Sequence, residues 1–235
     1  MASFPVSNTT LSYIRSMALV NAGIVLQEGK TQRVLSPSGS VLLTAELPEA
    51  WPQQSGLYDV HSFINVLGMF KATTPMIEFS DTTMTVSKGS GAKVHYRMSD
   101  PVLLAKSTVS DEKVKKFRTD NPAVSFVLSD QAREQLHKMA RLLGLDRVNV
   151  KIENKTVTVT AFDSEKESQH GFEYEVPESD VTFHDENFTT DITFNEEHLS
   201  LFFEGSYTVH VGKWQYAVFN HLQDPISYLV IIISA

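Results

Sequence analysis

The chain contains no cysteine among its 235 residues, and it lacks long hydrophobic runs. The missing cysteine excludes a disulfide framework and thiolate chemistry, and it suits a reducing compartment such as the cytoplasm. The longest apolar run, residues 228–233, is far too short for a transmembrane helix and is rich in β-branched residues, which predicts a buried strand. We recognise no signal peptide, and we expect no membrane partner.

Signatures of common catalytic sites are also missing. The eight histidines show no His-Glu-x-x-His spacing, and no Gly-x-Ser-x-Gly elbow is present. Residues 88–91, KGSG, lack the spacing of a phosphate-binding loop and predict a hairpin turn. A cluster at His184, Asp185 and Glu186 is compatible with a metal or acid–base site, but a polar loop explains it more simply. We therefore expect no enzyme, cofactor or metal.

Positive charge is scarce, since 20 Lys and Arg face 28 Asp and Glu, for a net charge of −8. An acidic balance normally argues against nucleic-acid binding, which depends on cations that release counterions from phosphates. The charges are unevenly placed, however: acidic residues concentrate in 163–186 and 196–204, and cations in 106–118 and 133–147. The protein can therefore be acidic overall and basic on one face.

Residues 129–144 form the clearest amphipathic helix. Ser129 or Asp130 is its expected N-cap, and Gly144 its expected end. An apolar stripe comprises Leu136, Met139, Ala140 and Leu143. The cations Arg133, His137 and Arg141 recur at i, i+4 and i+8, and Lys138 widens this row. Taken alone, such a pattern is most often that of a solvated surface helix.

The order of expected elements occurs twice: helix, strands, short helix, strands. The helices are expected at 8–22, 61–70, 129–144 and 196–203, among many short antiparallel strands. We predict an α+β protein of two similar domains, 1–105 and 122–235, each with two helices backed by antiparallel sheets. Residues 106–121 have no sustained period and predict an interdomain linker.

Three stretches carry a family resemblance: LSYIRSMALVNAGIVLQEGK at 11–30, GLYDVHSFINVLGMF at 56–70 and ISYLVIIIS at 226–234. They resemble the sliding clamps of T-even-like bacteriophages, the processivity factors of their DNA polymerases. The resemblance implies the DNA clamp fold in a homotrimeric ring that encircles duplex DNA and tethers the replicative DNA polymerase. It also implies a clamp loader as partner and the cytoplasm of the infected bacterial host as location. Clamps of this family catalyse no reaction themselves. The resemblance leaves open a role in late transcription.

The resemblance further suggests which residues meet DNA and partners. The expected DNA-facing set is Arg15, Lys71, Arg133, His137, Lys138 and Arg141. The chain departs from the family pattern, because the first helix has one cation and the fourth carries Glu196, Glu197 and His198 with no Lys or Arg. A hydrophobic pocket for partner peptides is expected from Val41, Leu43, Leu103, Leu104, Ile231 and Ile233.

Two other classes of function remain open at this point: a β-rich hydrolase or small-ligand-binding enzyme, and a phage structural subunit.

If the chain forms a ring, one edge of the first domain must pair with a different edge of the second. The candidate edges are 84–87 or 94–98 in the first domain and 157–162 or 172–176 in the second.

Overall fold

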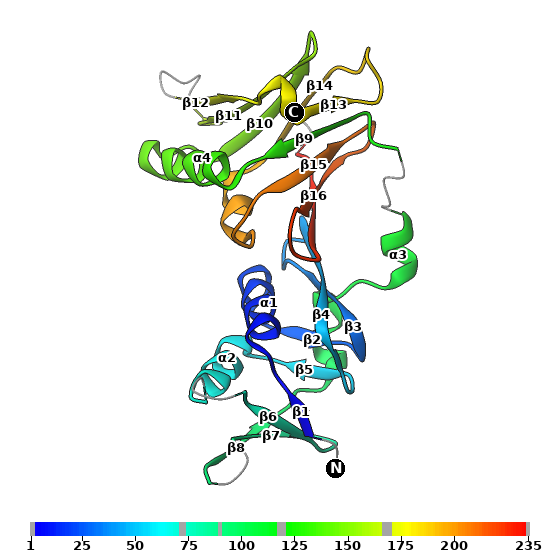
Figure 1. The fold of residues 1–235 in the computed structure, drawn as a ribbon, viewed down its shortest axis with the longest axis vertical. Coiled ribbons are helices and arrows are strands. Elements are labelled where there is room, and N and C mark those ends of the chain that lie inside the picture. Colours follow the sequence, from blue (N-terminus) through cyan, green and yellow to red (C-terminus); the bar gives the residue numbers. More distant parts are fainter. Residues whose placement is uncertain (1–2, 71–73, 89–90, 117–120, 166–170, 234–235) are drawn as a thin grey trace. The chain divides into compact units, whose positions relative to one another are not determined.

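The computed structural model describes residues 3–70, 74–88, 91–116, 121–165 and 171–233. The chain divides into two compact units, Met1–Lys115 and Lys116–Ala235. Both combine helices with antiparallel strands, so the predicted α+β class is confirmed (Figure 1). Within the described residues, no helix has the length and apolar character needed to cross a membrane.

Two helices lie together in the N-terminal unit, α1 (Asn8–Val20) and α2 (Val60–Gly68). The Ser7 hydroxyl accepts the Thr10 N–H at 3.1 Å, and the Asp59 carboxylate accepts the Ser62 N–H at 3.0 Å, so both helices begin at side-chain caps. The apolar stripe of α1 faces inward and packs against α2 and β4.

The strands of this unit form three antiparallel groups. They are β1 (Ser3–Pro5), β2 (Ile24–Leu26), β3 (Gly29–Leu35), β4 (Val41–Trp51), β5 (Ser55–Leu57), β6 (Met76–Phe79), β7 (Thr83–Ser87) and β8 (Lys93–Arg97). The orders are β1-β6-β7-β8, β2-β5 and β3 with β4. Trp51 is fully buried between the edge-on rings of Phe4 and Phe79, so it belongs to the core.

The segment expected to be a linker carries local helical structure. A 3-10 helix, η1 (Pro101–Ser107), is followed by the short helix α3 (Asp111–Lys116). The Asp100 carboxylate accepts the Val102 N–H at 2.9 Å and Pro101 occupies the first turn, which explains why a helical turn begins here.

In the C-terminal unit, α4 (Asp130–Leu143) is the principal helix, and it lies against β11 and β12 (Figure 1). Ser129 is its N-cap, with the hydroxyl 3.2 Å from the Ala132 nitrogen, and Gly144 ends it in the left-handed conformation at φ 68°. Both predicted ends are therefore confirmed. The second helical element is a 3-10 helix, η3 (Glu196–Leu201), where a short helix at 196–203 was expected.

Strands make up the rest of this unit. They are β9 (Val124–Leu128), β10 (Arg147–Glu153), β11 (Thr156–Phe162), β12 (Phe172–Glu175), β13 (Val181–Phe183), β14 (Thr190–Asn195), β15 (Tyr207–Val211), β16 (Tyr216–His221) and β17 (Ile226–Ile231), with the 3-10 turn η2 (Glu178–Asp180) between β12 and β13. They pair antiparallel in the orders β12-β11-β10-β14 and β13-β9-β15-β16-β17. An aromatic cluster of Phe202, Tyr207, Phe219 and Tyr228 fills the core beside them.

Candidate functional site

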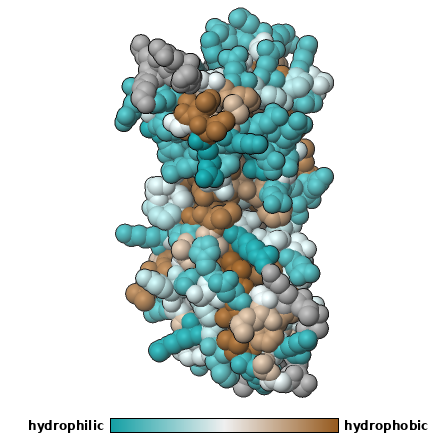
Figure 2. Space-filling model, turned by 90° about the vertical axis from the view of Figure 1, so that its left-hand side faces the viewer, coloured by the Kyte–Doolittle hydropathy of each residue, from teal (hydrophilic) through white to brown (hydrophobic). Residues whose placement is uncertain are grey.

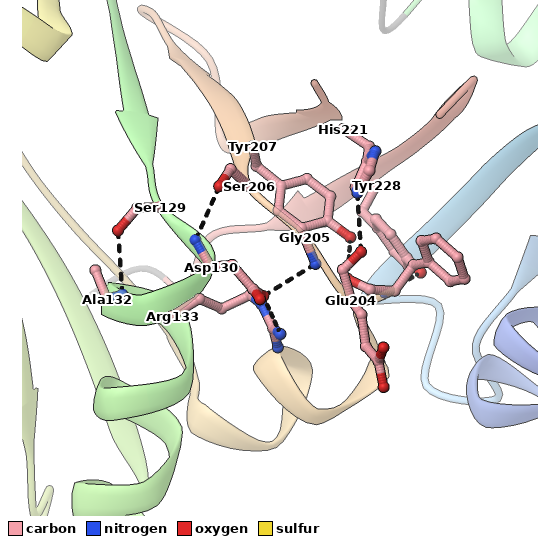
Figure 3. Close-up of polar contacts among 11 residues, drawn as sticks. Ser129, Asp130, Ala132, Arg133, Glu204, Gly205, Ser206, Tyr207, His221 and Tyr228 are labelled. Carbon is pink, nitrogen blue, oxygen red and sulfur yellow. Dashed lines mark hydrogen bonds and ion pairs between the residues drawn. The ribbon is translucent and has the colours of Figure 1, made fainter. Parts of the chain in front are cut away.

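The N-terminus of α4 is fixed by polar contacts to the segment that precedes β15 (Figure 3). The Asp130 N–H donates to the Ser206 hydroxyl at 3.0 Å, and Asp130 Oδ1 accepts the Gly205 N–H at 2.9 Å. The same oxygen accepts a bond from the Arg133 guanidinium at 2.7 Å. That bond is the main cause that lowers the pKa of Asp130.

His221 holds the loop at Glu204 and Gly205 in place. Its Nε2 donates to the Glu204 carbonyl at 2.9 Å, while Nδ1 accepts the N–H groups of Gln223 and Asp224. Gly205 has φ +132°, and a Cβ there would lie 2.0 Å from His221 Nε2, so this position requires glycine. The N-terminus of α4 is thus bonded to a loop whose conformation depends on Gly205 and His221.

Arg133 does not present its charge on the exposed face, so our expectation that it faces DNA is wrong. The residue is only 6% exposed and is paired with Asp130. The physical reason is helical drift: each i+4 step advances about 40° beyond a full turn, so the row Arg133, His137, Arg141 spans about 80°. Its first member therefore falls on the buried side, with Leu136 and Ala140.

His137 lies at the margin of the buried face. Its Nδ1 is 2.5 Å from Glu196 Oε1, and Glu196 is itself buried. This contact ties α4 to η3, in agreement with the position of these two elements against each other. His137 is therefore engaged within the protein rather than exposed as an isolated cation.

The exposed face of α4 is narrower and less basic than predicted. Its members are Gln131, Glu134, Gln135, Lys138, Arg141, Leu142 and Leu143. Leu143 was expected in the apolar stripe but is 38% exposed. Figure 2, a view from the side on which α4 lies in Figure 1, shows hydrophobic residues exposed in patches among hydrophilic ones. In the N-terminal unit Arg15 is exposed on α1, whereas Lys71 lies outside the described residues. Of the expected DNA-facing set, Arg15, Lys138 and Arg141 are thus placed with their side chains exposed.

A groove in the N-terminal unit contains part of the expected peptide pocket. Leu103 is 79% exposed, and with the half-buried Leu104 it lines a cavity of about 570 Å³. The other lining residues are Asn21, Ala22, Gly23, Pro37, Tyr58, Asp59, Lys106 and Ser107. Leu104 rests on Gly23, where an added Cβ would lie 3.1 Å from the leucine methyl. We name this cavity the Leu103 groove.

The remaining residues of the expected pocket differ in their placement. Val41 and Leu43 are completely buried in the core, so they are not available to a peptide and their assignment is wrong. The strand pattern misled us because both faces of β4 are largely covered here, so alternation does not separate core from surface. In the C-terminal unit, Ile231 is 40% exposed and Ile233 is half-buried.

The charged side chains around His184 are held by partners. The Ser125 hydroxyl lies 3.1 Å from His184 Nε2 and 2.8 Å from His210 Nδ1. Asp185 pairs with Lys213 at 3.6 Å, and Glu186 with Lys155 at 3.1 Å. Among the described residues, no three His, Cys, Asp or Glu side chains are grouped so that they could hold a metal ion.

Comparison with solved structures defines the class of fold. The chain superposes on "A. fulgidus PCNA" with a TM-score of 0.70 over 100% of this chain and 99% of that one, at 13% identity. For Thermococcus kodakaraensis PCNA the TM-score is 0.71 over 98% of this chain and 99% of that one, at 14% identity. For the Pseudomonas aeruginosa sliding clamp the TM-score is 0.69 over 99% of this chain and 66% of that one, also at 14% identity. The protein has the sliding-clamp fold, as the sequence predicted.

The sequence itself is similar to one phage protein in particular. It is 24% identical over 178 residues, 74% of this chain and 78% of the relative, to the "Sliding clamp" of Vibrio phage KVP40. No protein-family model matches the chain. The resemblance to phage clamps that the three sequence stretches indicated is therefore supported by a relative found independently.

Proposed function

We propose that this protein is a phage DNA sliding clamp: a ring subunit that encircles duplex DNA and tethers the replicative DNA polymerase in the infected bacterium. The observation that carries the proposal is a clamp fold that extends over the whole chain, joined to sequence similarity with a phage sliding clamp. The role is mechanical and needs no catalytic residues. A clamp loader would open and close the ring around DNA.

Exposed cations on α1 and α4 suit a surface that faces phosphates. Arg15, Lys138 and Arg141 are exposed on helix faces, where they form no ion pair among those found in the described residues. With so few cations, contact with DNA is weak. Enclosure, rather than affinity, would then keep the clamp on DNA.

The Leu103 groove is the proposed site for short peptides of the polymerase and other client proteins. Its exposed Leu103 and Tyr58 offer apolar area, and Lys106 at its margin favours an acidic residue in the peptide. We expect Leu103→Glu to weaken polymerase binding at least tenfold and to leave the oligomer intact. Val102→Glu is the matched control, because Val102 is 77% exposed but is outside the groove lining. Equal polymerase binding by the two variants would contradict this assignment.

The number of subunits follows from the two repeated units. Six such domains close a ring around duplex DNA in the clamp architecture, so a two-domain chain closes as a trimer. The trimer is a proposal that light scattering can test against three times 26.3 kDa. A stable dimer would contradict it.

A primer-extension assay tests the function directly. The phage polymerase and clamp loader, supplied with ATP and a primed circular template, are compared with and without this protein while excess trap DNA prevents rebinding. We expect products at least tenfold longer when the protein is present. Product length that does not change would refute the proposed function.

A further inference from the structure

The strand β8 lies at the edge of its sheet. It ends the order β1-β6-β7-β8, and among the described strands it pairs with β7 alone. Its side chains alternate between exposed and half-buried, so none of them is fully buried. Segments with few buried contacts open more easily than the strands of a core. The links between β8 and the rest of the N-terminal unit are therefore important for its stability.

One wall of the Leu103 groove is bonded to this strand. The wall consists of Tyr58 and Asp59, which both line the cavity. The hydroxyl of Tyr96, a residue of β8, donates to the Asp59 carbonyl at 2.8 Å. Burial raises the pKa of Tyr96 above its ordinary value, so this hydroxyl is protonated and can donate at neutral pH. Tyr96 itself is not one of the residues that line the groove.

The same wall is bonded to both helices of the unit. The Asp59 carboxylate caps α2, and the Val60 N–H donates to the Ala22 carbonyl, just beyond the end of α1, at 2.9 Å. The Tyr96 ring packs edge-on against Phe63 of α2, with 5.2 Å between the ring centroids. The wall, the first turn of α2 and β8 are thus linked to one another by direct contacts.

The η1 side of the groove is joined to β8 through the chain. Residues 98–100 lead from β8 into η1, which carries Leu103. The Ser99 N–H donates to the Gly56 carbonyl at 2.9 Å, and a Cβ on Gly56 would lie 2.4 Å from the Ser99 oxygen, so the two segments cross closely. The Asp100 carboxylate then caps η1. Both sides of the groove are therefore attached to β8.

We propose that Tyr96 couples the Leu103 groove to β8, so that a peptide in the groove holds this edge strand against β7. A peptide that contacts both sides of the groove binds while both are in place, and binding to one state of an equilibrium stabilises that state. Tyr96 is a positioning residue, because it acts through Asp59. The inference rests on the proposed peptide site. In a ring closed through this edge, a bound client protein would also slow ring opening.

The probe for this coupling is the shortest synthetic segment of the phage polymerase that competes with the whole enzyme for this protein. A short segment limits direct contact to the groove and its rim. Its binding must be weakened by Leu103→Glu, which shows that it occupies the groove. The wild type and Tyr96→Phe are compared at saturating peptide. The substitution keeps an aromatic ring against Phe63 and removes the hydroxyl alone.

Hydrogen exchange at β8 measures the coupling. The Met98 N–H donates to the Thr82 carbonyl at 2.9 Å, so exchange of this amide reports the opening of the strand end next to β7. We expect the peptide to slow this exchange at least fivefold in the wild type and less than twofold in Tyr96→Phe. A merely structural loss would raise exchange with and without peptide alike and leave the ratio unchanged. Equal ratios in the two proteins, or no slowing in the wild type, refute the inference.

Tyr174→Phe is the matched control. Tyr174 is half-buried on β12, a strand at a sheet edge of the C-terminal unit, and it is not one of the residues that line the groove. This variant loses a hydroxyl of the same kind and should retain the full slowing of the Met98 amide. All exchange rates are measured below the unfolding transition of each variant, so that a lower midpoint does not affect the comparison.

Exchange of subunits between rings tests the consequence for the assembly. Copies that carry a donor dye are mixed with copies that carry an acceptor dye, and the rise of energy transfer measures how often rings open. We expect the peptide to slow this rise at least fivefold in the wild type and less than twofold in Tyr96→Phe. A wild-type rate that the peptide leaves unchanged or increases contradicts the inference.

The inference and the peptide site on which it rests can fail separately. If the peptide occupies the groove but the exchange ratio of Met98 is the same in the wild type and in Tyr96→Phe, the peptide site stands and the coupling is wrong. If no polymerase segment competes, or if Leu103→Glu binds the segment normally, the peptide site is wrong and the inference fails with it.

Discussion

A single carboxylate, Asp130, joins the helix cap, a buried arginine and the loop at Gly205. It accepts bonds from both the Gly205 N–H and the Arg133 guanidinium. Removing it leaves the charge of Arg133, a 6% exposed residue, without its partner. Loss of a partner from a buried charge is among the changes that destabilise proteins strongly.

We expect Asp130→Ala to lower the free energy of unfolding by about 2 kcal/mol, less than for a fully buried pair because the Asp130 side chain is 44% exposed. Urea unfolding measures the change, and Glu134→Ala, an exposed position on the same helix, is the control, expected within about 0.5 kcal/mol of wild type. A loss no greater than that of the control would contradict the role of Asp130.

The same pair predicts a pH dependence. The folded pKa of Asp130 is below its unfolded value of 3.8, so the folded state favours the ionised form. The contribution is therefore complete only well above the unfolded value of 3.8, and it is lost as the pH falls through the folded pKa. The stability difference between wild type and Asp130→Ala should shrink below pH 4.

Lys138 and Arg141 offer the corresponding test of DNA contact. Both are exposed on α4, so replacing them by Ala should leave stability within about 0.5 kcal/mol of wild type. The salt dependence of DNA contact should flatten, by up to about 0.9 in the log–log slope per lost phosphate contact. Glu134→Gln is the control, since it lies on the same face but carries no cation. An unchanged slope would mean that these cations do not meet phosphates.

At the scale of elements, periodicity predicted the helices and strands that bury one face. Leu136 and Ala140 point to the core, and Ser129 and Gly144 mark the ends of α4, as expected. The strands β1 and β13 were missed because three residues are too few to establish a period.

The candidate sites were harder to predict than the elements. Arg133 illustrates why: the row of cations was interpreted as one exposed face, although helical drift places its first member on the buried side, where it pairs with Asp130. Val41 and Leu43 were expected in the pocket but lie in the core, because their burial depends on what covers the strand and the sequence alone does not show this. The sequence limited the edge strands to two candidates in each domain. Only the order in which the strands pair identifies β8 and β12 as the strands at an edge.

Proline substitutions at two adjacent positions of β8 distinguish the function of the open edge of this strand from that of the edge paired with β7. The Met98 N–H donates to the Thr82 carbonyl, and bonded and non-bonded pairs alternate along an antiparallel ladder. The Val94 N–H therefore points toward β7 and the His95 N–H points away. We expect His95→Pro to give folded monomers, and Val94→Pro to destabilise the N-terminal unit by about 3 kcal/mol. Light scattering and urea unfolding distinguish the two. If the His95→Pro variant still forms trimers, the open edge of β8 does not take part in the contact between subunits.

At the scale of the whole molecule, a net charge of −8 is difficult to combine with tight binding to DNA by affinity. Enclosure resolves the difficulty, because a ring needs no strong contact to stay on DNA that has no free end. In the proposed clamp, the exposed cations on α1 and α4 would meet phosphates during loading, whereas closure of the ring would retain the protein on DNA.

This division predicts how the loaded protein leaves DNA. On nicked circular DNA, retention should be governed by ring opening, so Lys138→Ala with Arg141→Ala should leave its half-life within about twofold of wild type, although it weakens DNA contact. If the circle is cut once, the wild-type protein should leave the linear DNA within the dead time of gel filtration. If both new ends are blocked by bound protein, the wild-type protein should again stay on the DNA. A wild type that stays equally long on circular and open linear DNA is held by affinity, and the ring would then be excluded.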